Sequence, residues 1–177
     1  MSLLVAPQKQ SPLSKLFSLE GKVCLVTGGN RYTPEGTFET GSDKYRRGIG
    51  LAIVQGFAEA GAAAVAIIHS SAAQADAAAE AAETIHKKYP QTTIPVLRAD
   101  VGQASEIEAA TQKVFEQFGR LDVVVANAGV YTDTPALEMT PDEAQQITNV
   151  NYFGVLYTAQ CAARYCCLSY CDGDPQC

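Results

Sequence analysis

Three glycines near the amino-terminal end have the pattern of a phosphate-binding loop that has been interrupted. Thr27 and Gly28 end an apolar stretch, and Gly48-Ile49-Gly50 opens a helical pattern. In such loops the first glycine allows a tight turn, the next lets the backbone approach a pyrophosphate, and the last packs helix against strand. The chemistry predicted here is the binding of a phosphorylated ligand by backbone N–H groups.

The segment that separates the two halves of this pattern, residues 31–47, is polar and rich in turn residues. It has no hydrophobic periodicity, so we expect no core element from it. Two explanations stay open. It is either a retained in-frame intron or an error of gene prediction, or it is a genuine loop insertion, which costs little closure entropy.

Short apolar runs alternate with longer helical patterns along the chain. The predicted strands are residues 22–27, 64–69, 93–98 and 121–126. The predicted helices are residues 49–60, 72–89, about 105–118 and 140–160. This alternation predicts an α/β fold with a doubly wound parallel sheet and helices on both faces. Ligands of such sheets bind beyond the carboxyl ends of the strands, so the loops after Thr27, His69, Arg98 and Ala126 are the candidate site.

Three local patterns predict how the helices begin and which faces they bury. Ile49, Ile53 and Phe57 share the apolar face of the first helix. Ser105 with Glu108, and Thr140 with Pro141 and Glu143, have the spacing of capping boxes.

Four loops together resemble the short-chain dehydrogenase/reductase family. They carry Thr27-Gly28, Gly48-Ile49-Gly50, Asp100-Val101 and Asn127-Ala128-Gly129, in the family's order. The resemblance covers about residues 16–165. Within the family, the chain is similar to reductases of ketoses and polyols such as sorbose, xylulose and mannitol. The resemblance implies a Rossmann-like fold whose carboxyl-terminal part is missing here, with residues 1–15 as a flexible arm. A helical pattern gives way to cysteines and turn residues after Tyr165, so residues 166–177 are either an aberrant cysteine-rich tail that follows a frame change or a genuine cysteine-rich carboxyl terminus.

The cofactor expected from this resemblance is a nicotinamide dinucleotide, with NADP(H) favoured over NAD(H). No carboxylate follows the strand 64–69 to accept from a ribose 2′-hydroxyl, and Ser70, Ser71 and Arg47 are candidates to bind a 2′-phosphate. Helix capping is an equally good role for the two serines.

Further roles are implied by the resemblance alone. Asp100 accepts from the adenine amino group beside the backbone of Val101, and Asn127, Ala128 and Gly129 line a ribose. Asn151 matches the family's helix asparagine, whose backbone helps to hold a proton-relay water.

The catalytic residues that the family requires after this point are not found. No tyrosine in the chain has a lysine four residues later, because Tyr165 is followed at that spacing by Ser169 and Tyr152 by Leu156. The implied reaction, hydride transfer between a carbonyl and an alcohol, needs this pair and a serine. We therefore expect the chain to be inactive as written. The alternative function is a non-catalytic nucleotide-binding or interaction fragment.

Composition limits the partners. The net charge of −6 argues against nucleic acid, and no apolar run is long enough to cross a membrane. The six cysteines show neither a disulfide framework nor a metal-site spacing, which predicts a reducing, cytoplasmic compartment and no bound metal. The expected partner is a small carbonyl or alcohol, with a homo-oligomer possible in the intact family fold. Strand 121–126 is expected at an apolar sheet edge, which predicts poor solubility.

Overall fold

A computed structural model describes residues 16–29, 32–34 and 45–170 of the chain. Within them, four parallel strands form one sheet in the order β5-β4-β1-β6. Their bounds are β1 Val23–Thr27, β4 Ala64–His69, β5 Val96–Arg98 and β6 Val123–Val125. The predicted strand at 93–98 is shorter because Pro95 has no N–H to donate to the ladder.

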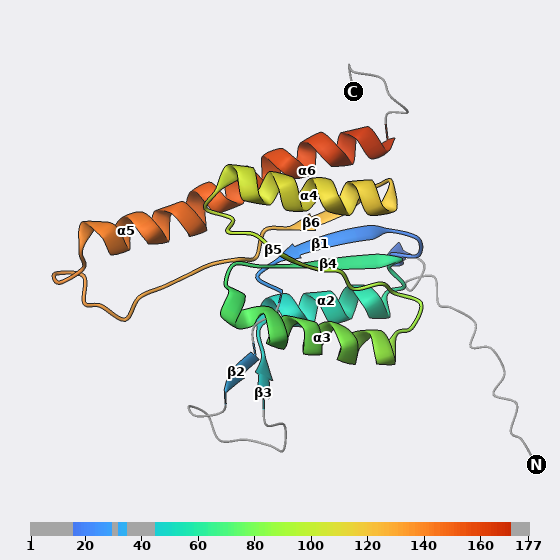
Figure 1. The fold of residues 1–177 in the computed structure, drawn as a ribbon, viewed down its shortest axis with the longest axis horizontal. Helices are drawn as coiled ribbons and strands as arrows, with labels where there is room; N and C mark the ends of the chain where they lie inside the picture. Colours follow the sequence, from blue (N-terminus) through green and yellow to red (C-terminus); the bar gives the residue numbers. More distant parts are fainter. Residues whose placement is uncertain (1–15, 30–31, 35–44, 171–177) are drawn as a thin grey trace, which may run out of the picture.

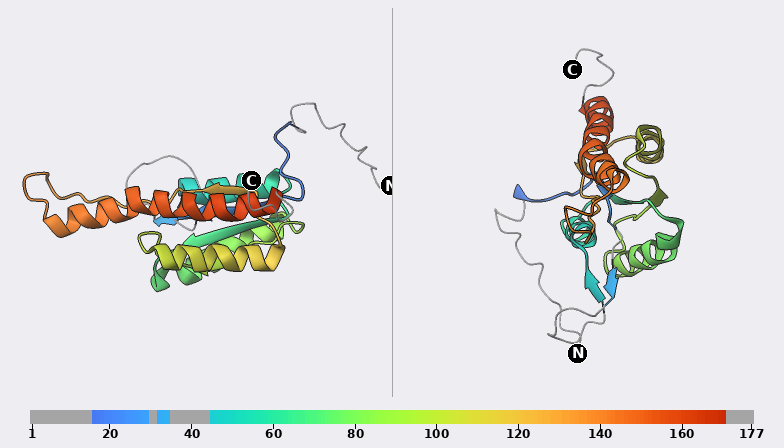
Figure 2. Two further views of the ribbon diagram at one scale, coloured as in Figure 1. Left: turned by 90° about the horizontal axis from the view of Figure 1, so that it is seen from above. Right: turned by 90° about the vertical axis from the view of Figure 1, so that its left-hand side faces the viewer.

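Helices cover both faces of this sheet (Figure 1). Their bounds are α2 Ile49–Glu59, α3 Ala75–Lys88, α4 Ala104–Phe118, α5 Pro141–Thr148 and α6 Gly154–Tyr170. α2 and α3 lie on one side, and α4 and α6 lie together on the other (Figures 1 and 2). The fold is therefore the predicted α/β architecture, Rossmann-like and doubly wound.

Each sheet face has its own apolar cluster, because successive strand side chains point to opposite faces. Leu25, Ala66 and Ile68 pack with the α4 and α6 side, whereas Val26 and Ile67 pack with the α2 and α3 side. β1 and β4 are buried along their full length, which explains their nearly unbroken apolar sequences. β6 lies at one edge of the sheet, as predicted, with its three valines only partly buried.

One of the predicted helix patterns is partly right and another is wrong. In α2, Ile53 and Phe57 pack against the core as predicted, but the Ile49 side chain is 77% exposed. The fully buried apolar residues of this helix are Leu51, Val54 and Ala58. The predicted capping box at Ser105 and Glu108 is absent, because the N-cap of α4 is Gln103, two residues before Ser105, and its side chain makes no capping hydrogen bond. Glu108 instead pairs with Arg164 of α6.

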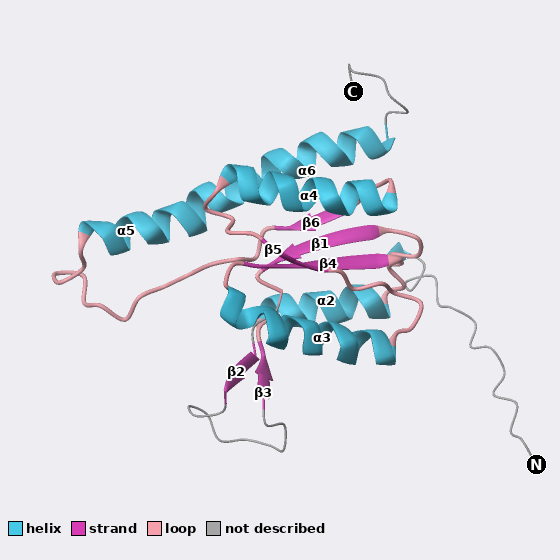
Figure 3. Cartoon of the chain, viewed as in Figure 1, coloured by secondary structure: helices cyan, strands magenta, loops and turns pink. Residues whose placement is uncertain are grey.

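The helix predicted at 140–160 is longer and interrupted. A π-helical turn, Asn149–Phe153, joins α5 to α6, and α6 continues to Tyr170 (Figure 3). The change in composition after Tyr165 is therefore no break in the backbone. Tyr165 is buried and Cys166 packs against the same cluster, because cysteine behaves as a small apolar residue in a core.

The inserted segment contributes an antiparallel pair outside the parallel sheet. β2 Tyr32–Pro34 pairs with β3 Tyr45–Arg47 (Figure 3). The expected amino-terminal arm, residues 1–15, and the end of the cysteine-rich tail, residues 171–177, lie outside the described residues. No helix in the described part of the chain combines the length and apolar character that a membrane span requires.

The capping box at the start of α5 is confirmed and is open to test. The Thr140 hydroxyl accepts from the Glu143 N–H at 3.3 Å, and the Glu143 carboxylate accepts from the Thr140 N–H at 2.8 Å. Thr140→Ala removes the first bond, so we expect a loss of about 1 kcal/mol in the free energy of unfolding. Urea denaturation measures this loss, and an unchanged midpoint would contradict it.

The same box predicts a dependence of stability on pH. The backbone N–H of Thr140, with the hydroxyls of Thr134 and Thr140, lowers the pKa of Glu143. A pKa that is lower in the folded chain stabilises it above the unfolded pKa, and this contribution disappears as the pH falls through the folded value. At neutral pH, wild type should be more stable than Glu143→Gln, and this difference in stability should disappear on acidification. Thermal unfolding of both chains from neutral to acid pH measures it.

Cys24, in the centre of β1, is expected to be unreactive in the folded chain. Burial, with a smaller contribution from Asp122, raises its pKa to about 12, and Lys22 opposes this. The thiolate fraction is then roughly a thousandfold below that of an ordinary cysteine. Native alkylation followed by mass spectrometry should label the exposed Cys167 and leave Cys24 unmodified until urea is added. Equal labelling of the two cysteines would contradict the buried position of Cys24.

Candidate cofactor-binding site

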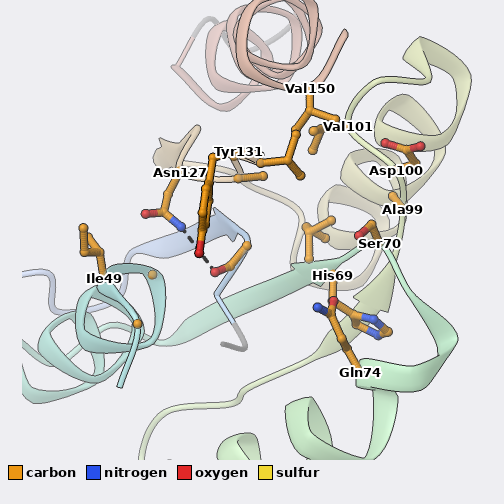
Figure 4. A pocket seen from close by; sticks show the side chains of 17 residues that line it. Ile49, His69, Ser70, Gln74, Ala99, Asp100, Val101, Asn127, Tyr131 and Val150 are labelled. Atoms are coloured by element: carbon orange, nitrogen blue, oxygen red, sulfur yellow. Dashed lines mark hydrogen bonds between the residues drawn. The ribbon is translucent and has the colours of Figure 1, made fainter. Parts of the chain in front are cut away.

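A cavity of about 600 Å³ opens at the carboxyl ends of the parallel strands (Figure 4). It takes residues from all four predicted loops and from the turn before α3. Its volume is in the range of small-molecule and cofactor sites. The predicted site residues that line it are Gly28, Gly48, Ile49, Gly50, Ser70, Asp100, Val101, Asn127, Ala128 and Gly129.

The two halves of the interrupted glycine pattern meet in space. Gly28 has φ +67°, a left-handed conformation that favours glycine, and its N–H donates to the Ile68 carbonyl at 2.8 Å. A Cβ on Gly50 would lie 2.4 Å from the Gly28 oxygen and 2.5 Å from Asn127 Nδ2. No side chain fits at this contact. The close approach leaves the amino-terminal end of α2 facing the cavity, as phosphate binding requires.

Thr27 does not line the cavity but holds the loop that does. Its buried hydroxyl accepts from the N–H groups of Asn127 and Ala128, each at 3.0 Å. The Asn127 amide donates back to the Thr27 and Gly28 carbonyls at 2.9 and 3.2 Å. These bonds join the ends of β1 and β6, so the loops after both strands have one defined arrangement.

The loop after β5 is held from both sides. The Asp100 carboxylate accepts from the Gly102 N–H at 2.9 Å, and the Asp100 N–H donates to Glu106 at 2.9 Å. Gly154 lies against Val101, where a Cβ would be 2.7 Å from the valine methyl group. The π-helical segment can therefore approach the cavity closely.

The structure separates the two serines after β4. Ser70 lines the cavity, whereas the Ser71 hydroxyl accepts from the Ala73 N–H at 3.2 Å and caps the short 3₁₀ turn Ala72–Gln74. The Ser71 carbonyl lies 3.0 Å from His69 Nδ1, which places the donor hydrogen of the ring on that nitrogen. The capping role therefore applies to Ser71, and Ser70 is free to face a ligand.

Asn151 is not among the lining residues. Asn151 lies in the π-helical turn, where Oδ1 accepts from the Val130 N–H and Nδ2 donates to the Val130 carbonyl, both at 2.8 Å. This side chain therefore clamps the loop after β6. The role predicted for its backbone stays a prediction. The side chain of Arg47 lies outside the described part of the structure.

Several lining residues were missed by the sequence analysis. The most informative are His69, Gln74, Tyr131 and Val150. In Figure 4, Gln74 reaches the cavity from the side of His69 and Ser70, and Tyr131 extends into it near Asn127. His69 and Tyr131 adjoin predicted motifs and could have been included on that ground. No sequence signal marks Gln74 or Val150, because turn geometry and helix packing bring them to the cavity.

Comparison with known proteins identifies the family. The model described as "short chain dehydrogenase" matches residues 40–169, which is most of the chain. The chain therefore belongs to the short-chain dehydrogenase family. Within the described ranges, no group of three or more histidine, cysteine, aspartate or glutamate side chains is placed to hold a metal ion.

Individual relatives agree with this assignment. An uncharacterized oxidoreductase of Methylorubrum extorquens is 37% identical over 150 residues, which are 85% of this chain and 52% of the relative. Sorbose reductase of Candida albicans is 31% identical over 87% of this chain and 48% of its own length, which confirms the likeness to a ketose reductase. The crystal structure of NADPH-dependent 3-quinuclidinone reductase from Rhodotorula rubra has a TM-score of 0.69 at 26% identity, covering 90% of this chain and 53% of that one. The chain spans about half the length of these relatives.

Proposed function

We propose that the cavity binds a nicotinamide dinucleotide, with NADP(H) preferred. The observation that carries this proposal is the contact between Gly28 and Gly50, where a Cβ would collide with backbone. That contact brings a strand end and a helix amino-terminal end together beside a cavity of cofactor size. This geometry suits a pyrophosphate bound by backbone N–H groups.

Different lining residues would contact different parts of the cofactor. Gly28 and Gly48 to Gly50 would hold the pyrophosphate. Ala128 and Gly129 would contact a ribose, with Asn127 and Thr27 holding their loop in place. The Asp100 carboxylate and the Val101 backbone would accept and donate at the adenine edge, although one Asp100 oxygen is already bonded to Gly102.

The preference for NADP(H) is supported by the chemistry at Ser70. A carboxylate here would repel a 2′-phosphate and favour the 2′-hydroxyl of NAD(H), whereas the serine hydroxyl donates to either. Arg47 remains a candidate for a second contact. The relative from Rhodotorula rubra is itself NADPH-dependent, which agrees with this preference.

The reaction class we propose for the intact family member is the interconversion of a small carbonyl compound and its alcohol. When bound, the cofactor supplies or accepts hydride. The residues of this chain orient the cofactor through the glycine loop and close one side of the cavity with Tyr131 and Val150. A homo-oligomer and a cytoplasmic location stay predictions.

A non-catalytic, dinucleotide-binding role is the second candidate for the 177 residues themselves. The observation that favours it is that no tyrosine is followed by lysine at the required spacing. Asn151, which matches a relay position, has its side chain bound to the backbone of Val130. We therefore expect cofactor binding without turnover.

Titration of the purified chain with NADPH and NADH tests both statements. The chain has no tryptophan, so nicotinamide emission is followed without energy transfer from indole. We expect saturable enhancement with NADPH and weaker binding of NADH. Oxidation of NADPH with sorbose as substrate should remain at background. Absence of binding would overturn the proposed function, and measurable turnover would overturn the non-catalytic role.

A further inference from the structure

The last residue of β5, Arg98, does not itself line the cavity but is hydrogen-bonded to Ser70, which does. In the parallel register Arg98 is paired with His69, the residue before Ser70. Its Nε donates to the Ser70 carbonyl at 3.2 Å. The guanidinium is therefore attached to a residue that lines the cavity, from a strand on which the sequence analysis placed no site residue.

Strand alternation shows on which side of the sheet Arg98 lies. Leu97 packs with the apolar cluster under α4 and α6, and Val96 packs with the cluster under α2 and α3. Because side chains alternate along a strand, Arg98 shares the face of Val96. That is the face of the turn before α3, which brings Gln74 to the cavity beside Ser70 and His69 (Figure 4).

We propose that Arg98 is a specificity-determining residue that binds the 2′-phosphate of NADP(H), with Gln74 and Ser70 as neutral donors. This inference rests on the proposed function. With Nε held by Ser70, the two terminal amino groups have no hydrogen bond or ion pair within the described residues, and the side chain is exposed. A guanidinium in this position offers further donors to a phosphate that carries nearly two negative charges.

The charges around this end of the cavity agree with the assignment. Ser70 and Gln74 are neutral, and Asp100, which supplies the one lining carboxylate among the described residues, accepts from the Gly102 N–H on its own loop. Arg98 thus supplies a positive charge at the ribose end, and Asp100 a negative one towards the adenine. The positive charge of Arg98 would attract the 2′-phosphate of NADP(H), whereas it would add little to the binding of the uncharged 2′-hydroxyl of NAD(H).

Arg98→Met, with Arg98→Lys as the milder change, tests the assignment in the full chain. Arg164→Met is the matched control, because it removes the same charge from an exposed pair on α6, on the opposite face of the sheet. Nicotinamide fluorescence gives the Kd of NADPH and of NADH for each chain, and 2′,5′-ADP against 5′-ADP as competitors isolates the phosphate. Urea midpoints establish that the variants are folded.

We expect Arg98→Met to raise the Kd of NADPH and of 2′,5′-ADP by about tenfold or more. The Kd of NADH and of 5′-ADP should change by about twofold at most. Arg98→Lys should retain part of the preference, and Arg164→Met all of it. Equal weakening of both nucleotides would mean that Arg98 only supports the Ser70 loop and would overturn the inference, as would unchanged binding. A wild-type chain that binds neither nucleotide would instead remove the proposed function itself.

Discussion

Gly50→Ala should weaken NADPH binding by about tenfold or more and lower the free energy of unfolding by about 1–3 kcal/mol. The added methyl carbon would lie 2.4 Å from the Gly28 oxygen and 2.5 Å from Asn127 Nδ2. Neither atom can move alone, because the Gly28 N–H is bonded to Ile68 and the Asn127 amide to the end of β1. The loops that contain Gly28 and Gly50 must therefore move apart. Fluorescence titration and urea denaturation measure the two effects.

Gly56→Ala is the matched control in the same helix. A Cβ at Gly56 would meet nothing within 4 Å, so this substitution should stabilise the chain by about 0.5–1 kcal/mol through helix propensity alone. NADPH binding should be unchanged. If Gly50→Ala behaved like Gly56→Ala in both assays, the close contact between the two halves of the glycine pattern would not exist in solution.

Asp122→Ala is expected to be strongly destabilising, at about 1–3 kcal/mol, because it removes the acceptor of a buried backbone N–H. The side chain is 1% exposed and lies at the opposite end of the sheet from the cavity. Its oxygens accept from Lys22 Nζ at 3.2 Å, from the Val23 N–H at 2.8 Å and from the Arg120 guanidinium at 2.6 and 2.8 Å. Truncation leaves two cations and a backbone N–H of β1 without this carboxylate.

The control for Asp122 is Glu83→Ala, which breaks an exposed pair with Lys87 one helical turn away. Exposed pairs of this kind contribute about 0.3–0.5 kcal/mol, so its denaturation midpoint should stay close to wild type. Comparable losses for Asp122→Ala and Glu83→Ala would show that Asp122 is hydrated rather than buried.

β1 and β6 are joined by hydrogen bonds at both ends, and the two ends differ in whether they border the cavity. Asp122 joins β1 and β6 at their amino-terminal ends, and the Thr27–Asn127 bonds join the same two strands at their carboxyl ends. Only the second set borders the cavity. Asp122→Ala should therefore lower stability without changing the ratio of NADPH to NADH affinity in the fraction that remains folded.

The sequence by itself determined the alternation of strands and helices, the loops of the site and the family. These properties depend on local patterns: the apolar run of residues 64–69, the capping box at Thr140, and the glycines around Gly48. Buried strands and capped helix ends require particular residue types, so the sequence alone shows where strands end and helices begin. The loops at these ends contain the ten predicted binding residues that line the cavity.

The tertiary structure decided what each residue faces. Thr27 and Asn151 bind loops rather than lining the cavity, Ser71 caps a turn, and Ile49 lies outside the core. Gln74 reaches the Ser70 end of the cavity from the turn before α3, and Arg98 of β5 donates to the Ser70 carbonyl. Such placements depend on strand register and on the direction of a helix, which bring together residues far apart in the chain. Periodicity within one segment contains no information about them.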